Sequence, residues 1–215
     1  MYRKLFSFSC IIGGLLILCL LSSCSRPQKS GMDFDEIDTS RDPIQRSTPS
    51  NDPILIETKE GHYTLTPVAE YQLAGRVVSK ETYSYGWEGE ISPVDLAIAW
   101  GKLAEPEHEK YVSFSQRNRW YFYEYKPESP LDNSYIIPHS SNNHIIPATE
   151  NISLALKTIQ RKEKVILEGL LVNLKGTYKE GTVYWNTSMT RKDTGDSSCE
   201  IFYVTKIRIN TDVYE

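Results

Sequence analysis

Much of this 215-residue chain consists of short segments in which apolar residues recur at every second position. Residues 182–190 read TVYWNTSMT, and residues 199–209 read CEIFYVTKIRI. Because successive side chains of a strand point to opposite faces, both segments predict strands with one buried and one solvent-facing side. The chain also contains fourteen tyrosines, and aromatic residues favour strands. The alternation therefore predicts a strand-rich fold.

Further segments have the same character and are separated by turn residues. The motif KEG (residues 59–61) fits a hairpin turn, and Arg117-Asn118 fits a second one. Gly75 is expected to mark a bulge or bend in a longer strand, and residues 84–90 a turn-rich connection. The expected additional strands cover residues 54–58, 62–66, 71–85, 111–116, 119–125 and 165–174.

Two short helices are expected between these strands. Ser92, Pro93 and Asp95 fit a helix start, since serine can cap, proline suits the first helical position and aspartate can complete a capping box. This helix would cover residues 92–100. A second helix is expected over residues 149–160, where apolar residues fall on one stripe at helical spacing.

The order of these elements predicts the fold class. It shows no regular alternation of strand and helix that would indicate a parallel sheet, and no internal repeat. We therefore expect a mostly antiparallel α+β domain, with a bent sheet or small barrel, OB-like in type, covered by the two helices. Residues 127–147 contain four prolines and many serines and asparagines, which predicts a long loop.

The N-terminus has the features of a targeting segment. Two basic residues precede an apolar run at residues 10–21, which fits a secretory signal and is short for a membrane span of about 20 residues. The run ends in LSSC (residues 21–24), which resembles the lipobox of bacterial lipoproteins. That resemblance implies lipidation of the Cys24 thiol and cleavage before it, and Ser25 resembles an outer-membrane address facing the periplasm. An uncleaved anchor helix and an ordinary secretory signal are the alternatives.

The domain boundaries follow from composition. Residues 1–23 are the expected signal peptide. Residues 24–52 are rich in Ser, Asp, Pro and Arg with isolated apolar residues, which predicts a disordered tether. Residues 53–215 are the expected single β-rich domain. Once the signal is removed and Cys24 is lipidated, Cys199 is left without a disulfide partner in its own chain.

Several side chains are candidates for metal binding or catalysis. His139 and His144 lie four residues apart in the expected loop, but no third ligand has suitable spacing for a metal. Asp193-Thr194-Gly195 matches the tripeptide of aspartic proteases, although the basic residues before it do not fit that class. Cys199 with His144 would make a nucleophile and its base; burial of the thiol is the alternative.

The second expected hairpin combines basic and aromatic residues. Arg117, Arg119, Tyr121, Tyr123 and Tyr125 would form a surface that can stack on sugars or bases and hold an anion. A half-exposed sheet face without ligand is the alternative. The formal net charge of −4 argues against a broad nucleic-acid surface.

The folded part also resembles an uncharacterised family of small bacterial exported or membrane-associated proteins. The residues that carry this resemblance are ISPVDLAIAWG (91–101), NHIIPA (143–148) and TRKDTGDSSCE (190–200). It implies one compact domain over about residues 70–209 and assigns no catalytic residues.

These observations lead to two expectations of function. The first is a lipoprotein held in the cell envelope by lipid on Cys24, with a binding or structural role toward an envelope protein or glycan and none toward nucleic acid. The second is an envelope hydrolase that uses residues 139–144 and 191–200. Candidate site residues are His144, Arg191, Asp193, Cys199, Arg119, Tyr121 and Tyr123; no catalytic set, metal or cofactor is expected.

Overall fold

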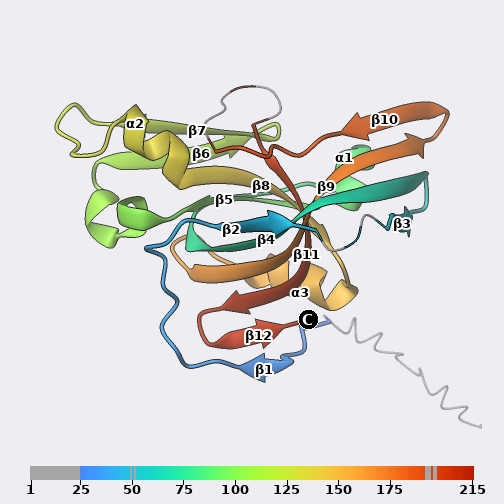
Figure 1. Cartoon of the computed structure of the whole chain (residues 1–215), viewed down its shortest axis with the longest axis horizontal. Helices are drawn as coiled ribbons and strands as arrows, with labels where there is room; N and C mark the ends of the chain where they lie inside the picture. Colours follow the sequence, from blue (N-terminus) through green and yellow to red (C-terminus); the bar gives the residue numbers. More distant parts are fainter. Residues whose placement is uncertain (1–24, 49, 51, 192–194, 196–197) are drawn as a thin grey trace, which may run out of the picture.

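The computed structural model describes residues 25–48, 50, 52–191, 195 and 198–215. Among these residues, ten strands form one mixed sheet and two more form a separate hairpin (Figure 1). The strands are β1 (Gly31–Met32), β2 (Ile44–Ser47), β3 (Ile54–Glu57), β4 (Gly61–Thr82), β5 (Val94–Ala99), β6 (Val112–Arg117), β7 (Trp120–Tyr125), β8 (Ser140–Pro147), β9 (Lys164–Tyr178), β10 (Gly181–Trp185), β11 (Glu200–Ile209) and β12 (Asp212–Tyr214). The helices are α1 (Gly86–Ile91), α2 (Asn133–Ile136) and α3 (Glu150–Thr158), with short 3-10 helices η1 (Gly101–Ala104), η2 (Pro106–His108) and η3 (Ile137–His139).

The long strand β4 gives the sheet its curvature. Its first part pairs with β9 and its last part with β5, both antiparallel. The change of partner coincides with Gly75, where an added Cβ would lie 2.7 Å from the carbonyl oxygen of Ala99, and with an irregularity in pairing between Val77 and Ser79. Gly75 itself is regularly paired with Val165, so the irregularity lies just after the predicted position. The strand β4 changes partner from β9 to β5 at Arg76.

The remaining pairings connect the strands around the core. β5 pairs with β8, β8 pairs in parallel with β11, and β11 pairs with β9. The sheet ends at β1 on one side and β10 on the other, and it is not a closed barrel. The expected α+β class with a mostly antiparallel, bent sheet is confirmed, whereas closure into a barrel is not.

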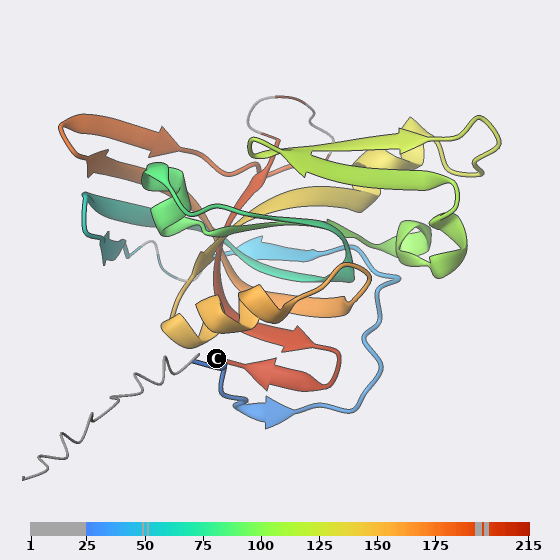
Figure 2. The same cartoon turned by 180° about the vertical axis from the view of Figure 1, so that it is seen from behind.

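The inner side of the curved sheet holds the main core. Fully buried side chains from β4, β5, β9 and β11 pack there against α3, which contacts β8, β11 and β12 (Figure 2). The Thr149 hydroxyl caps α3 by accepting from the backbone N–H of Ile152 at 3.2 Å. The helix expected at residues 149–160 is thus confirmed, because its apolar stripe meets the core.

The helix expected at residues 92–100 is wrong. The segment forms β5, in which every residue from Val94 to Ala99 is buried. A strand buried on both faces has a continuous apolar sequence, and such a sequence has no period of its own that would separate strand from helix. A short helix does occur, at residues 86–91, where a turn-rich connection was expected.

The long loop expected at residues 127–147 is wrong from residue 133 onward. Residues 133–139 form α2 and η3. Residues 140–147 form β8, a buried strand between β5 and β11. Its first four residues are Ser-Ser-Asn-Asn, so their polarity resembles that of a loop. They are buried because neighbouring strands and side chains take up their hydrogen bonds.

The expected disorder of residues 24–52 is wrong for the part that the structure describes. β1 pairs with β12, and β2 pairs with the outer edge of β4. Ile37, between them, is buried. These short strands gain backbone hydrogen bonds at open sheet edges, which a measure of apolar content does not register. Residues 1–24, including the expected signal peptide and Cys24, lie outside the described residues.

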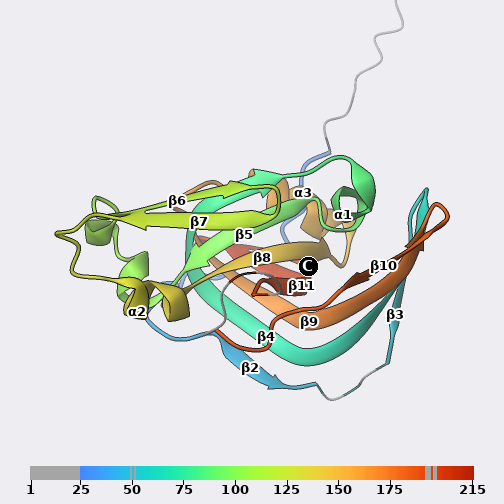
Figure 3. The same cartoon turned by 90° about the horizontal axis from the view of Figure 1, so that it is seen from above.

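The predicted hairpins are confirmed. β3 pairs with β4, and β6 pairs with β7. Two further predicted strands also form, since residues 165–174 lie within β9 and the last segment forms β11. The strand predicted at residues 182–190 forms only over residues 182–185, in β10. The β6–β7 hairpin lies over β5 and β8, on the side of the sheet away from the main core (Figures 1 and 3).

Candidate functional site

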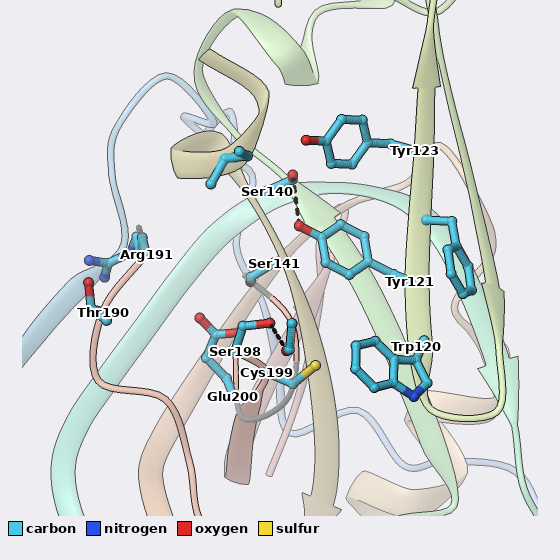
Figure 4. Close-up of a pocket in the computed structure, with 13 residues that line it drawn as sticks. Trp120, Tyr121, Tyr123, Ser140, Ser141, Thr190, Arg191, Ser198, Cys199 and Glu200 are labelled. Carbon is cyan, nitrogen blue, oxygen red and sulfur yellow. Dashed lines mark hydrogen bonds between the residues drawn. The ribbon is translucent and has the colours of Figure 1, made fainter. Parts of the chain in front are cut away.

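A cavity of about 340 Å³ opens between β7, β8 and the chain that leads into β11 (Figure 4). Four aromatic residues of β7, at positions 120–123, line it. The facing wall carries hydroxyl, thiol and charged groups, among them Ser140, Arg191, Cys199 and Glu200. The volume and the combination of rings with a few polar groups are typical of small-ligand sites.

The β6–β7 hairpin owes its geometry to a two-residue turn. Asn118 and Arg119 have φ values of 53° and 70°, and this left-handed conformation at both positions suits the twist of paired strands. Arg117 pairs with Trp120, so the turn lies one residue later than predicted. Figure 4 shows Tyr121 directed from β7 toward β8.

Tyr121 and Tyr123 face the sheet and bring polar atoms to the cavity. The Tyr121 hydroxyl lies 3.5 Å from the Oγ of Ser140, and burial raises the pKa of Tyr121 to about 12. The Tyr123 hydroxyl donates to Asn133 at 3.0 Å, and burial raises its pKa as well. Both phenols are therefore protonated at neutral pH and can act as hydrogen-bond donors.

Beneath the hairpin, β8 presents polar side chains in place of apolar ones. Asn142 is fully buried and holds three parts of the site together. Its Oδ1 accepts from Gln116 at 2.7 Å, and its Nδ2 donates to the carbonyl of Arg119 at 2.9 Å. The same Nδ2 lies 3.7 Å from the Sγ of Cys199. The hairpin is thus fixed to the sheet by side-chain amides.

A buried charged cluster lies under the tip of the hairpin. The Nη1 of Arg119 is 2.6 Å from the Oδ1 of Asp95, and the Nδ1 of His144 is 2.9 Å from the same oxygen. Arg119 also donates from Nη2 to the carbonyl of Ser92 at 2.9 Å. Asp95 is fully buried. Arg119 therefore places a positive charge directly on a buried carboxylate, which reduces the cost of burying both.

Aromatic rings surround this cluster. The guanidinium of Arg119 lies 3.6 Å from the ring centroid of Tyr83, and the His144 ring lies 4.5 Å from that of Trp185. Burial, together with the nearby charge of Asp95, raises the pKa of Tyr83 to about 12. The rings place apolar surface beside the charges, and a low local dielectric strengthens electrostatic interactions.

A second cavity of about 150 Å³ adjoins the first. Trp120, Gly195 and Cys199 line both cavities. His144 and Arg119 line only the smaller one. The two cavities are therefore neighbours that share part of their lining.

Arg191 and Glu200 supply charge at the other side of the larger cavity. Arg191 donates from Nη2 to the carbonyl of Pro43 at 3.2 Å, and its guanidinium lies 5.7 Å from the ring centroid of Tyr71. Burial raises the pKa of Tyr71, and the charge of Glu200 adds to this. A cation and a carboxylate thus face the aromatic wall from a common side.

The candidate residues from the sequence are brought close together where the structure describes them. His144, Arg191, Cys199, Arg119, Tyr121 and Tyr123 all line one of the two adjoining cavities. Cys24 and Asp193 lie outside the described residues. His139 is separate, because its ring stacks on Tyr135 at 3.8 Å.

Three residues of the site, Asp95, Trp120 and Glu200, are not among the candidates predicted from the sequence. Asp95 was assigned to a helix cap, although one carboxylate within an apolar run is also what a buried ion pair looks like in sequence. Trp120 precedes Tyr121 and so alternates with it along the strand, but its ring also lines the cavity (Figure 4). Glu200 gave no signal, since it follows a turn rich in charged residues.

One group outside the cavities could approach a metal ion. Glu105, Glu107 and His108 place ligand atoms within 4.8 Å of one another. Both carboxylates are exposed, and all three lie in or beside one short 3-10 helix. Exposed acidic groups in this arrangement are common without a metal, so we assign no metal site to these three residues.

Comparisons with known proteins do not identify a relative. No family model, no curated protein and no solved structure matches this chain. Within the described residues, no helix has the length and apolar character needed to cross a membrane. Function must therefore be argued from the site itself.

Proposed function

We propose that this protein is a lipid-anchored protein of the bacterial cell envelope whose domain binds a glycan between β7 and β8. The anchor part of the proposal is supported by the LSSC motif at residues 21–24. The binding part is carried by one observation: the aromatic residues at 120–123 line a cavity of about 340 Å³ together with Arg191, Glu200 and Ser140.

The connectivity of the sheet supports an OB-like assignment within this proposal. β4 pairs with β5, β5 pairs with β8, β8 pairs with β11, and β9 pairs with both β4 and β11. The helix α3 lies between β8 and β9 in sequence. In OB folds, the second and third strands form the face that binds oligonucleotides and oligosaccharides. The corresponding strands are β5 and β8, and the proposed site lies on the outer face of β8.

The chemistry of the cavity favours a glycan over a nucleic acid. A sugar ring has apolar faces that pack on aromatic rings, and its hydroxyls both donate and accept hydrogen bonds. Arg191 can donate to such hydroxyls, and Glu200 can accept from them. A nucleic-acid ligand would require several cations along its phosphates, whereas the chain has a formal net charge of −4.

A binding titration with matched variants tests this proposal. The full chain in detergent is titrated calorimetrically with a panel of envelope oligosaccharides. Trp120 and Tyr125 lie on the same strand with similar exposure, 42% and 40%, but Trp120 alone lines the cavity. We expect Trp120→Ala to weaken binding about tenfold or more, by about 1.4 kcal/mol, and Tyr125→Ala to leave it unchanged. Equal effects of the two substitutions, or no binding in the panel, would refute the proposal.

A second candidate function is hydrolysis through Cys199, and one arrangement favours it. Asp95 contacts the Nδ1 of His144, and His144 and Cys199 line the same small cavity. In this mechanism, the imidazole takes the thiol proton and the thiolate attacks the acyl carbon of an ester or amide. The bond to the leaving alcohol or amine breaks, and that group takes the proton from the imidazolium. Water then cleaves the acyl–sulfur bond, which releases the acid and restores the thiol. We expect Cys199 to react with iodoacetamide faster than a free thiol at neutral pH, and His144→Gln to remove that advantage. Equal rates in both proteins would exclude this function.

A further inference from the structure

The chain that follows Cys24 is hydrogen-bonded first to α3 and then to β12, beginning at Gln28. The backbone N–H of Gln28 donates to Asn151 Oδ1 at 2.7 Å, and Asn151 Nδ2 donates back to the Gln28 carbonyl at 2.9 Å. The N–H of Ser30 then donates to the Val213 carbonyl at 2.8 Å. Because four extended residues span at most about 14 Å, a lipid on Cys24 would hold this edge of the domain close to the bilayer.

Directly after β1, the backbone is fixed in a tight turn. Asp33 donates its N–H to the carbonyl of Thr211 at 2.9 Å, and its Oδ1 accepts from the N–H of Asp35 at 3.0 Å. The buried guanidinium of Arg208 binds both the Asp33 carboxylate and the Asp35 carbonyl. Four hydrogen bonds therefore define the conformation on either side of Phe34.

This turn presents apolar side chains to the outside. Phe34 is 76% exposed, and Met32, two residues earlier, is 54% exposed. Two large apolar side chains held outward on a rigid edge are unfavourable in water and indicate an interaction surface. Aromatic and apolar side chains at such a position are suited to the boundary of a lipid bilayer.

We propose that the β1–β12 edge docks on the bilayer that carries the lipid of Cys24, with Phe34 and Met32 inserted at its surface. This rests on the lipidation in the proposed function. The acyl chains supply the attachment, and the two side chains set the orientation of the domain. β1 and β12 lie at the opposite end of the molecule from the β6–β7 hairpin (Figures 1 and 2), so the glycan cavity would face away from the membrane.

Site-specific fluorescence on the full acylated chain tests this orientation. An environment-sensitive label is attached at position 34 through Phe34→Cys, in a Cys199→Ser background, and the protein is placed in vesicles of phosphatidylethanolamine and phosphatidylglycerol. The matched control is Tyr85→Cys, because Tyr85 is an equally exposed aromatic residue, at 83%, beside α1. We expect a several-fold rise and blue shift of emission at position 34, with quenching by nitroxide lipids, and no change at position 85.

The outcomes separate this proposal from the lipidation on which it rests. Mass spectrometry first determines whether Cys24 carries acyl chains; their absence would overturn the anchor and the docking together. Acylated protein in which positions 34 and 85 respond alike would overturn the docking alone. A response at position 34 that follows protein density and ignores nitroxide lipids would mean that a second copy covers the edge, which also contradicts the proposal.

Discussion

Replacing Arg119 by methionine should uncouple the tip of the β6–β7 hairpin from the sheet. Arg119 is the cation closest to the fully buried carboxylate of Asp95, at 2.6 Å. Removing one partner of a buried ion pair costs about 3–5 kcal/mol, because it leaves a buried charge without compensation. His144 remains 2.9 Å from the carboxylate and reduces that cost. We therefore expect the free energy of unfolding to fall by about 3 kcal/mol.

A double-mutant cycle measures the interaction itself. Asp95→Asn, Arg119→Met and the double variant are unfolded in urea, with tryptophan fluorescence as the signal. Trp185 lies 5.6 Å from the Arg119 guanidinium and reports on this region. Because the double variant leaves neither charge unpaired, we expect it to be about 2 kcal/mol more stable than the sum of the single effects predicts.

The control for this cycle is an exposed ion pair in the same chain. Arg41 and Asp38 lie 2.9 Å apart at the surface, where such pairs contribute about 0.2–1 kcal/mol. If the coupling of Arg119 with Asp95 is no larger than that of the surface pair, the charged cluster does not hold the hairpin in place. The claim that the Asp95–Arg119 ion pair fixes the hairpin tip to the sheet would then be wrong.

Three further changes test other parts of the structure. Lys80 donates from Nζ to three carbonyls at the end of α3. Lys80→Met should therefore lower the free energy of unfolding by about 1–2 kcal/mol, and an unchanged melting temperature would contradict this. Gly169→Ala would place a Cβ against the carbonyl of Tyr203, and we expect a loss of about 3 kcal/mol or more in urea unfolding, whereas a neutral effect would mean that β9 and β11 approach less closely. Burial raises the pKa of Tyr121 to about 12, above its unfolded value near 10. Its contribution to stability is therefore complete below about pH 10 and is lost as the pH rises toward 12; Tyr121→Phe should flatten that decline in urea titrations, and an identical pH profile would refute it.

The parts of the fold that sequence predicted are those with a local pattern. Residues 149–160 carry a complete apolar stripe, and Thr149 caps the helix in the way that the sequence implies. The β6–β7 hairpin is indicated by alternation and by a turn residue, Asn118, that tolerates positive φ. In both cases, neighbouring residues alone determine the conformation, so a sequence pattern is sufficient.

The parts that sequence did not predict depend on distant residues. β5 is a strand because β4 and β8 lie on both its sides, although Ser92 and Pro93 would suit a helix start equally well. β8 begins with four polar residues, and Asn142 is stable in the interior only because Gln116 and Arg119 bond to it. Local propensity cannot register such partners.

The same distinction applies to the site. Tyr121 and Tyr123 could be selected in advance because they alternate along one strand. Asp95 could not be selected from the sequence, because its partner Arg119 lies at a hairpin tip 24 residues later in the chain. The approach of Cys199 to His144 likewise follows from the parallel pairing of β8 with β11, which no spacing in the sequence indicates.

The most direct test of the central claim is a crystal structure of the protein with the tightest-binding oligosaccharide of the panel. We expect a sugar ring stacked on Trp120 or Tyr121, with hydroxyls within hydrogen-bond distance of Arg191 or Glu200. A sugar bound elsewhere would contradict it, for example in the open groove between β3 and β10 that Leu55 and Tyr184 line.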